Sequence, residues 1–147
     1  MMDRVFWNIG LKTPDMDAEI EYFEKLGARL LVRETLPIPG GEGTIEYAVL
    51  EFGGTRIFLS PTTVFEDKLV DDLRPGVTHA VFETDDIERE CAKLRELGSE
   101  VLVEPVLIDA RIGRRIVSFW RSPNGVVFEV MQILEGRNGC RSLYPDP

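Results

Sequence analysis

The sequence predicts an α+β fold of two tandem βαβββ modules that together form one concave, cleft-lining sheet. Two observations carry this prediction. The halves of the chain match at one constant offset of 71 residues, the separation of Asn8 and His79, and no gap is needed. Each half also shows the same order of periodicity: strand-like, then helical, then strand-like again. We therefore assign residues 4–61 and 76–134 to the two modules.

Identities at this offset are sparse but run through the whole module. The stretch from Asn8 to Met16 meets the stretch from His79 to Ile87. Further matching pairs are Glu19 with Glu90, Leu26–Gly27 with Leu97–Gly98, Leu31–Val32 with Leu102–Val103, Ile45 with Ile116, and Gly54 with Gly125. An offset that holds from the first strand to the last indicates a duplication.

Each module is expected to open with a strand and a helix. Short apolar and β-branched runs at Val5–Leu11 and Val77–Phe82 predict the strands. Acidic residues at Asp15 and Asp86 mark the helix starts. Apolar residues at helical spacing then predict one buried face per helix. They are Met16, Ile20, Phe23 and Leu26 in the first helix and Ile87, Cys91, Leu94 and Leu97 in the second, and Gly27 and Gly98 follow them.

Three more strands complete each module, and the last two are joined by tight turns at Gly53–Gly54 and Asn124–Gly125. The predicted strands are Arg29–Glu34, Thr44–Phe52 and Thr55–Ser60 in the first module, and Glu100–Glu104, Arg115–Arg121 and Val126–Gln132 in the second. Residues 62–75 form a linker. Residues 135–147 form a polar tail without periodicity, for which we expect either disorder or a position across a partner.

The composition excludes several classes of partner. A net charge of −9 argues against nucleic-acid binding, which needs a basic face. No segment approaches the about 20 apolar residues of a membrane span, and no signal-peptide pattern opens the chain. We therefore expect a cytoplasmic protein that binds neither nucleic acid nor membrane. Cys91 is expected in the core, and Cys140 is expected to be a free thiol in the tail.

Strand alternation places four positions on the concave face: Asn8, Phe58, His79 and Glu129. His79 is the only histidine, and Glu129 lies in an apolar strand where a carboxylate is costly to bury without a partner. A purely structural histidine and a solvated sheet face are the alternatives to a functional pair.

Two segments resemble the vicinal oxygen chelate (VOC) superfamily, which contains glyoxalase I, extradiol dioxygenases and bleomycin-resistance proteins. Gly76–Ile87 is similar to its "GHIAF-V-DI" signature, and Ser122–Val130 resembles its "DP-G--IEL" ending. Members usually carry metal ligands in the first and last strand of each module. The resemblance maps these ligand positions onto Asn8, Phe58, His79 and Glu129.

This resemblance implies an incomplete metal site. His79 and Glu129 match the family's ligand types, Asn8 is a weak substitute for histidine, and Phe58 cannot coordinate. We expect no tightly bound cofactor; a weakly held divalent metal on His79, Glu129 and Asn8 is left open. Extradiol dioxygenase chemistry is disfavoured because it needs two histidines and a carboxylate on iron.

Two functions fit these residues. The first is a glyoxalase-like lyase or isomerase in which His79 or Glu129 acts as general acid or base on a small molecule. The second is a protein of the bleomycin-resistance type that sequesters a ligand without chemistry. Its apolar pocket floor would comprise Phe6, Phe58, Met131 and Trp120.

A basic cluster enters the third strand of the second module. Arg111 and Arg115 could hold a carboxylate or phosphate of the ligand. The alternative is a solvated hairpin whose charge is offset by nearby acids. The family resemblance also implies a homodimer.

Overall fold

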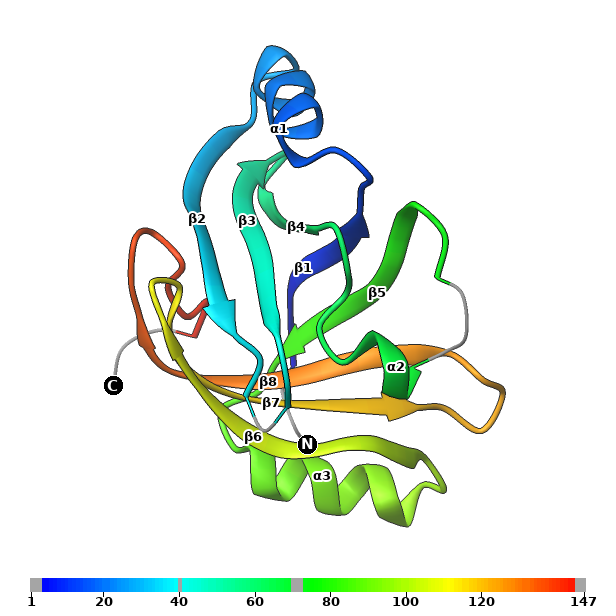
Figure 1. Cartoon of the computed structure of the whole chain (residues 1–147). Helices are drawn as coiled ribbons and strands as arrows, with labels where there is room; N and C mark the ends of the chain where they lie inside the picture. The colour runs from blue at the N-terminus through cyan, green and yellow to red at the C-terminus, as the bar shows by residue number, and fades with distance from the viewer. Residues whose placement is uncertain (1–3, 40, 70–72, 145–147) are drawn as a thin grey trace.

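The computed structural model describes residues 4–39, 41–69 and 73–144 and confirms the tandem βαβββ fold (Figure 1). The elements are β1 Val5–Lys12, α1 Met16–Lys25, β2 Arg29–Pro37, β3 Thr44–Phe52, β4 Thr55–Ser60, α2 Glu66–Leu69, β5 Gly76–Glu83, α3 Ile87–Glu96, β6 Glu100–Ala110, β7 Gly113–Arg121 and β8 Val127–Gly136. Sequence reasoning missed the short α2 in the linker and ended β2, β6 and β8 too early. Residues 70–72 of that linker and 145–147 of the tail lie outside the described part of the chain.

The strands form one curled sheet of eight strands in the order β2-β3-β4-β1-β5-β8-β7-β6. Within each module the first and last strands pair in parallel, β1 with β4 and β5 with β8. The modules join where β1 and β5 pair antiparallel, with Asn8 opposite Val81 and Gly10 opposite His79. The two equivalent first strands therefore lie side by side at the centre of the sheet.

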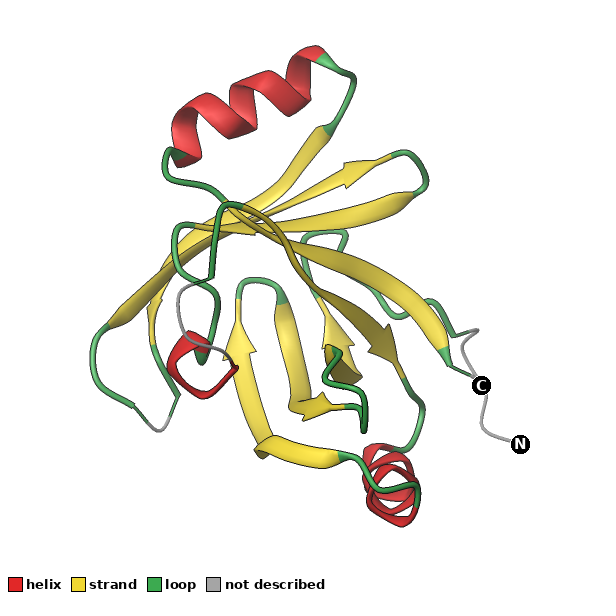
Figure 2. Ribbon diagram, turned by 90° about the vertical axis from the view of Figure 1, so that its right-hand side faces the viewer, coloured by secondary structure: helices red, strands yellow, loops and turns green. Residues whose placement is uncertain are grey.

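The two long helices cover the outer face of the sheet, one on each module (Figure 2). Met16 and Ile20 of α1 pack on the β3 and β4 side chains Ala48, Leu50, Ile57 and Leu59. On α3 the corresponding apolar face packs on Trp120 and Val130, and it includes Cys91, whose expected core position is confirmed. None of the helices described is both long and apolar enough to span a lipid bilayer.

Strand β1 breaks simple alternation at Trp7. The register with β5 shifts between Phe6, which lies opposite Phe82, and Asn8, so that Trp7 is the extra residue of a β-bulge. Trp7 and Asn8 consequently both reach the concave side, whereas Phe6 is 42% exposed on the convex face. The expectation that Phe6 shares a face with Asn8 is wrong because alternation fails at a bulge.

The turn between β6 and β7 closes the curl. The backbone N–H of Arg111 donates to the Glu34 carboxylate on β2 (3.0 Å), which also accepts a hydrogen bond from the Tyr47 hydroxyl (2.5 Å). Because β2 and β6 are the two edges of the sheet, this contact joins its ends. Gly113 permits the tight turn: its φ is +123°, and a Cβ there would lie 2.0 Å from the Glu135 carbonyl oxygen.

The described part of the tail, residues 137–144, packs against its own chain. The Trp7 indole donates to the Arg141 carbonyl (3.1 Å), and the buried Glu83 carboxylate accepts hydrogen bonds from the Leu143 amide (2.8 Å) and the Ser142 hydroxyl. Cys140 is a free thiol, as predicted, but it is fully buried in the inner core and does not lie in a disordered tail. Burial raises the pKa of the Cys140 thiol, which keeps it protonated.

Candidate functional site

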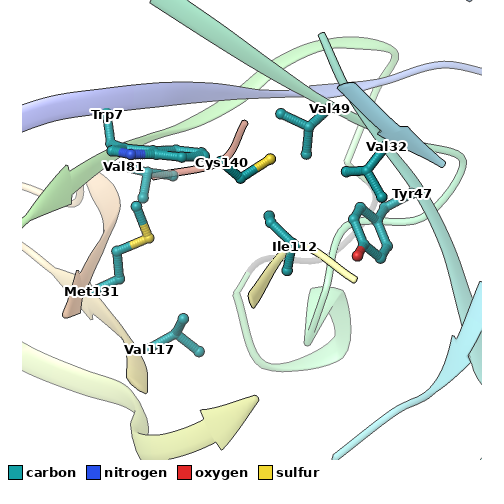
Figure 3. Close-up of a cluster of buried hydrophobic side chains, with 9 residues drawn as sticks. All are labelled: Trp7, Val32, Tyr47, Val49, Val81, Ile112, Val117, Met131 and Cys140. Carbon is teal, nitrogen blue, oxygen red and sulfur yellow. The ribbon is translucent and has the colours of Figure 1, made fainter. Parts of the chain in front are cut away.

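The concave face encloses a cavity lined by residues of both modules. Its walls are mainly apolar. Its volume, taken as the space open to the centre of a water molecule, is about 70 Å³. Figure 3 shows Cys140 and Ile112 in the inner cluster, between Trp7 and Tyr47. Besides Trp7 and Tyr47, the polar side chains in the described lining are Asn8, Ser60, Thr63, Thr78, His79, Arg115 and Glu129. The space suits a small molecule with a few polar groups.

His79 and Glu129 are in direct contact in this cavity. Glu129 lies on β8, which runs parallel to β5, and its Oε1 is 3.2 Å from His79 Nε2. The Glu129 side chain is 13% exposed and the His79 side chain is 6% exposed. The imidazole lies 5.1 Å from the Phe119 ring, centroid to centroid. The structure therefore brings the two residues together, while their role in function stays a prediction.

A glycine makes room for the histidine. A Cβ on Gly10 would lie 2.7 Å from His79 Cε1 and 2.8 Å from Thr78 Oγ1, so that any larger residue would displace the imidazole. Sequence reasoning missed Gly10 as a site residue. The available signal was a glycine in the middle of a strand. Glycine weakens a strand interior and often marks a position that another group approaches closely.

Hydrogen bonding around Thr78 determines where the histidine carries its protons. The Thr78 hydroxyl donates to the Gly10 carbonyl (3.0 Å) and lies 2.9 Å from His79 Nδ1. A hydroxyl has a single proton and a carbonyl can only accept, so Nδ1–H must donate to Thr78. A neutral imidazole then has no proton left on Nε2. The 3.2 Å contact between Nε2 and Glu129 Oε1 becomes a hydrogen bond when one of these two atoms carries a further proton.

The equivalent positions of the first module differ in chemistry. Asn8 is 3% exposed and lines the cavity, and within the described chain its side-chain amide makes no hydrogen bond. Phe58 stacks on Tyr47 with ring centroids 5.0 Å apart and planes 1° from parallel. Burial and the hydrogen bond to Glu34 raise the pKa of Tyr47, so this wall of the cavity stays uncharged.

These residues do not fit a tightly held metal ion. Structural and catalytic sites normally supply at least three good protein ligands. Here His79 and Glu129 are good metal ligands and the Asn8 amide is a weak one. The Phe58 ring, which cannot coordinate a metal, occupies the fourth ligand position that the sequence resemblance indicates. Among residues 4–39, 41–69 and 73–144, no three His, Cys, Asp or Glu side chains are grouped to hold an ion.

Arg115 is the buried cation of the cavity. Its Nη2 donates to the carbonyls of Ile112 (3.2 Å) and Cys140 (3.4 Å), and its Nη1 lies 3.3 Å from Met131 Sδ. Its Nε has no partner in the described chain, and the guanidinium stacks 4.9 Å from the Trp7 ring centroid. Burial lowers the pKa of Arg115, but from a value so high that the group stays charged at neutral pH.

The remaining predicted ligand-binding residues divide into two groups. Phe58, Met131 and Arg115 line the cavity. Phe6, Trp120 and Arg111 do not, which corrects the prediction. The side chains of β7 alternate, so Trp120 points away from the cavity and is fully buried under α3. Arg111 lies exposed at the turn, where its guanidinium donates to the Arg33 carbonyl (3.4 Å).

Comparison with known proteins agrees with this geometry. A family model described as "Glyoxalase/Bleomycin resistance protein/Dioxygenase superfamily" matches residues 7–130. A hypothetical protein from Bacillus halodurans C-125 superposes with a TM-score of 0.72 at 22% identity, covering 99% of both chains. Methylmalonyl-CoA epimerase from Mycobacterium tuberculosis has a TM-score of 0.68 at 22% identity, covering 87% of both chains.

A single-substitution variant of the Streptomyces coelicolor methylmalonyl-CoA epimerase, in complex with 2-nitronate-propionyl-CoA, is similar as well. Its TM-score is 0.71 at 21% identity, over 93% of this chain and 99% of that one. No curated protein sequence matches the chain significantly. At these identities the solved structures establish a shared fold.

The histidine proton can be located by ¹⁵N NMR, because a single histidine gives one set of ring signals. We expect a protonated Nδ1 at neutral pH. In Thr78→Val, which removes the acceptor, a neutral ring should move its proton to Nε2, facing Glu129. A wild-type ring protonated on Nε2 alone would contradict this arrangement.

Metal content is a second measurement. We expect elemental analysis of protein purified without added ions to find far less than one zinc, nickel or iron per chain. Phe58→Glu restores a carboxylate at the fourth position and should increase metal retention. Near-stoichiometric metal in the unmodified protein would show that the donor set is sufficient after all.

Proposed function

The chain belongs to the Glyoxalase/Bleomycin resistance protein/Dioxygenase superfamily, and from that premise we propose that its cavity binds a small organic molecule and isomerises it by acid/base catalysis. The observation that carries this proposal is the direct contact between His79 Nε2 and Glu129 Oε1 (3.2 Å) in the cavity wall. Within the described chain, Glu129 Oε2 makes no hydrogen bond and can take a proton from a ligand.

The proposed reaction is proton transfer at a carbon next to a carbonyl group. The C–H bond breaks, the proton moves to Glu129 Oε2, and the electron pair delocalises onto the carbonyl oxygen. The Asn8 amide, buried and without a protein partner, donates a hydrogen bond to that oxygen as its charge grows. Return of the proton to another face or atom gives the isomer.

Two features support this chemistry. The Tyr47–Phe58 stack forms an apolar wall, which limits water around the developing charge. The methylmalonyl-CoA epimerases that share this fold are, by name, isomerases. A binding protein without catalysis is the second candidate, and the largely apolar lining of the cavity favours it.

We also propose a homodimer, as the resemblance implies. Phe6, Phe82 and Phe128 form an aromatic patch on the convex face, with Phe6 42% exposed. Sedimentation equilibrium should give about twice the chain mass of 16.7 kDa at micromolar concentration. Phe6→Asp should lower that mass; a wild-type monomer would refute the proposal.

The catalytic proposal is tested by exchange of carbon-bound hydrogen in D₂O. We expect the protein to accelerate loss of the C3 proton signal of 2-oxobutanoate, followed by ¹H NMR. Glu129→Gln keeps the shape but removes the base, and should slow exchange by about 100-fold or more. Glu135→Gln on the exposed end of the same strand is the matched control and should exchange like the parent.

If the parent binds 2-oxobutanoate without accelerating exchange, the sequestering function is favoured. If Glu129→Gln retains the fold by circular dichroism and exchanges as fast as the parent, Glu129 is not the base.

A further inference from the structure

We propose that Arg115 recognises an anionic group, so that the ligand of the cavity is a small carboxylate. This inference deepens the proposed function by naming the ligand class. It rests on one part of that proposal, that a ligand binds in the cavity, and does not depend on catalysis.

The first step is the burial of Arg115 without a counter-ion. The residue is 4% exposed, and its partners are two backbone carbonyls and a thioether. No described carboxylate forms an ion pair with it, and its Nε is unpaired. A buried charge is costly unless it is paired, and neutral acceptors offset only part of that cost. A ligand anion would supply the missing partner.

The second step excludes Glu129 as that partner. It is the only acid among the described residues that line the cavity. Its Oε1 faces His79 Nε2 at 3.2 Å, and within the described chain no ion pair joins Glu129 to Arg115. The charges of Glu129 and Glu83 offset only part of the burial that lowers the pKa of Arg115.

The third step concerns the buried carboxylate behind the wall. Glu83 is 1% exposed, and its oxygens accept hydrogen bonds from Leu143 and Ser142 of the C-terminal segment. A second guanidinium, Arg56, is also buried beside Trp7, and its Nε donates to the Trp7 carbonyl (3.0 Å). Both Glu83 oxygens are thus committed to the C-terminal segment, and within the described chain no ion pair joins Glu83 to either guanidinium.

The geometry favours a carboxylate over a larger anion. A guanidinium presents its N–H groups in a planar fork that matches two carboxylate oxygens. Stacking on Trp7 and the bonds to Ile112 and Cys140 hold that plane in place, while the weak contact to the Met131 sulfur can give way to a ligand oxygen. The apolar remainder of the ligand then lies toward the Tyr47–Phe58 wall.

The test compares two probes of matched shape, pentanoate and pentanamide, by NMR titration. We expect the unmodified protein to bind pentanoate about tenfold or more tightly than pentanamide. Arg115→Gln should abolish this preference. Arg111→Gln, which removes the neighbouring exposed guanidinium, is the matched control and should keep it. Equal affinities for the two probes in the unmodified protein would overturn the inference.

A second measurement keeps the test decisive if Arg115→Gln fails to fold. In the unmodified protein, pentanoate should shift the Arg115 Nε–H signal, and pentanamide should not. Inorganic phosphate that displaces pentanoate at equal concentration would overturn the choice of a carboxylate. If Glu129→Gln still binds pentanoate, the carboxylate inference is supported even when no exchange catalysis is found. The ligand proposal and the catalytic proposal can therefore fail independently of each other.

Discussion

The antiparallel pairing of β1 with β5 is the constraint on which the site depends. This pairing joins the modules through their equivalent strands and sets Gly10 opposite His79. With no side chain at Gly10, the imidazole can lie against β1, and the Gly10 carbonyl takes the Thr78 proton. One backbone register therefore places the histidine, sets its Nδ1 against the Thr78 hydroxyl and turns its Nε2 toward Glu129. A shift of one residue would turn every one of these side chains to the other face.

Duplication followed by divergence gives the cavity two unlike sides. The second module supplies the acid/base pair, whereas at the equivalent positions the first supplies an amide and an aromatic ring. A symmetric set of four ligands would favour a central metal ion. The asymmetric set instead favours a ligand held in one orientation, with its polar end toward the second module and its apolar end toward Phe58.

Properties that depend on periodicity could be predicted from the sequence, and those that depend on register could not. The offset of 71 residues predicted the two modules. Strand alternation predicted that Asn8, His79 and Glu129 face the same side of the sheet, and all three line the cavity. The same alternation failed for Phe6, because the bulge at Trp7 adds one residue to β1. Arg111 and Arg115 have similar sequence surroundings, and only the position of the turn at Gly113 separates an exposed arginine from a buried one.

The C-terminal segment supports the cavity wall from behind, although its composition suggested a polar tail without a fixed position. Two of its contacts with the cavity wall are made through the backbone: the Arg141 carbonyl accepts from Trp7, and the Cys140 carbonyl accepts from Arg115. Such contacts leave no hydrophobic periodicity in the sequence, so a polar segment can be well packed and still look like a loose tail. Because Trp7 stacks on the guanidinium that Cys140 also holds, the segment orients the cation of the cavity from behind. The buried Glu83 accepts hydrogen bonds from that segment, so a carboxylate behind the cavity wall holds in place the chain that positions Arg115.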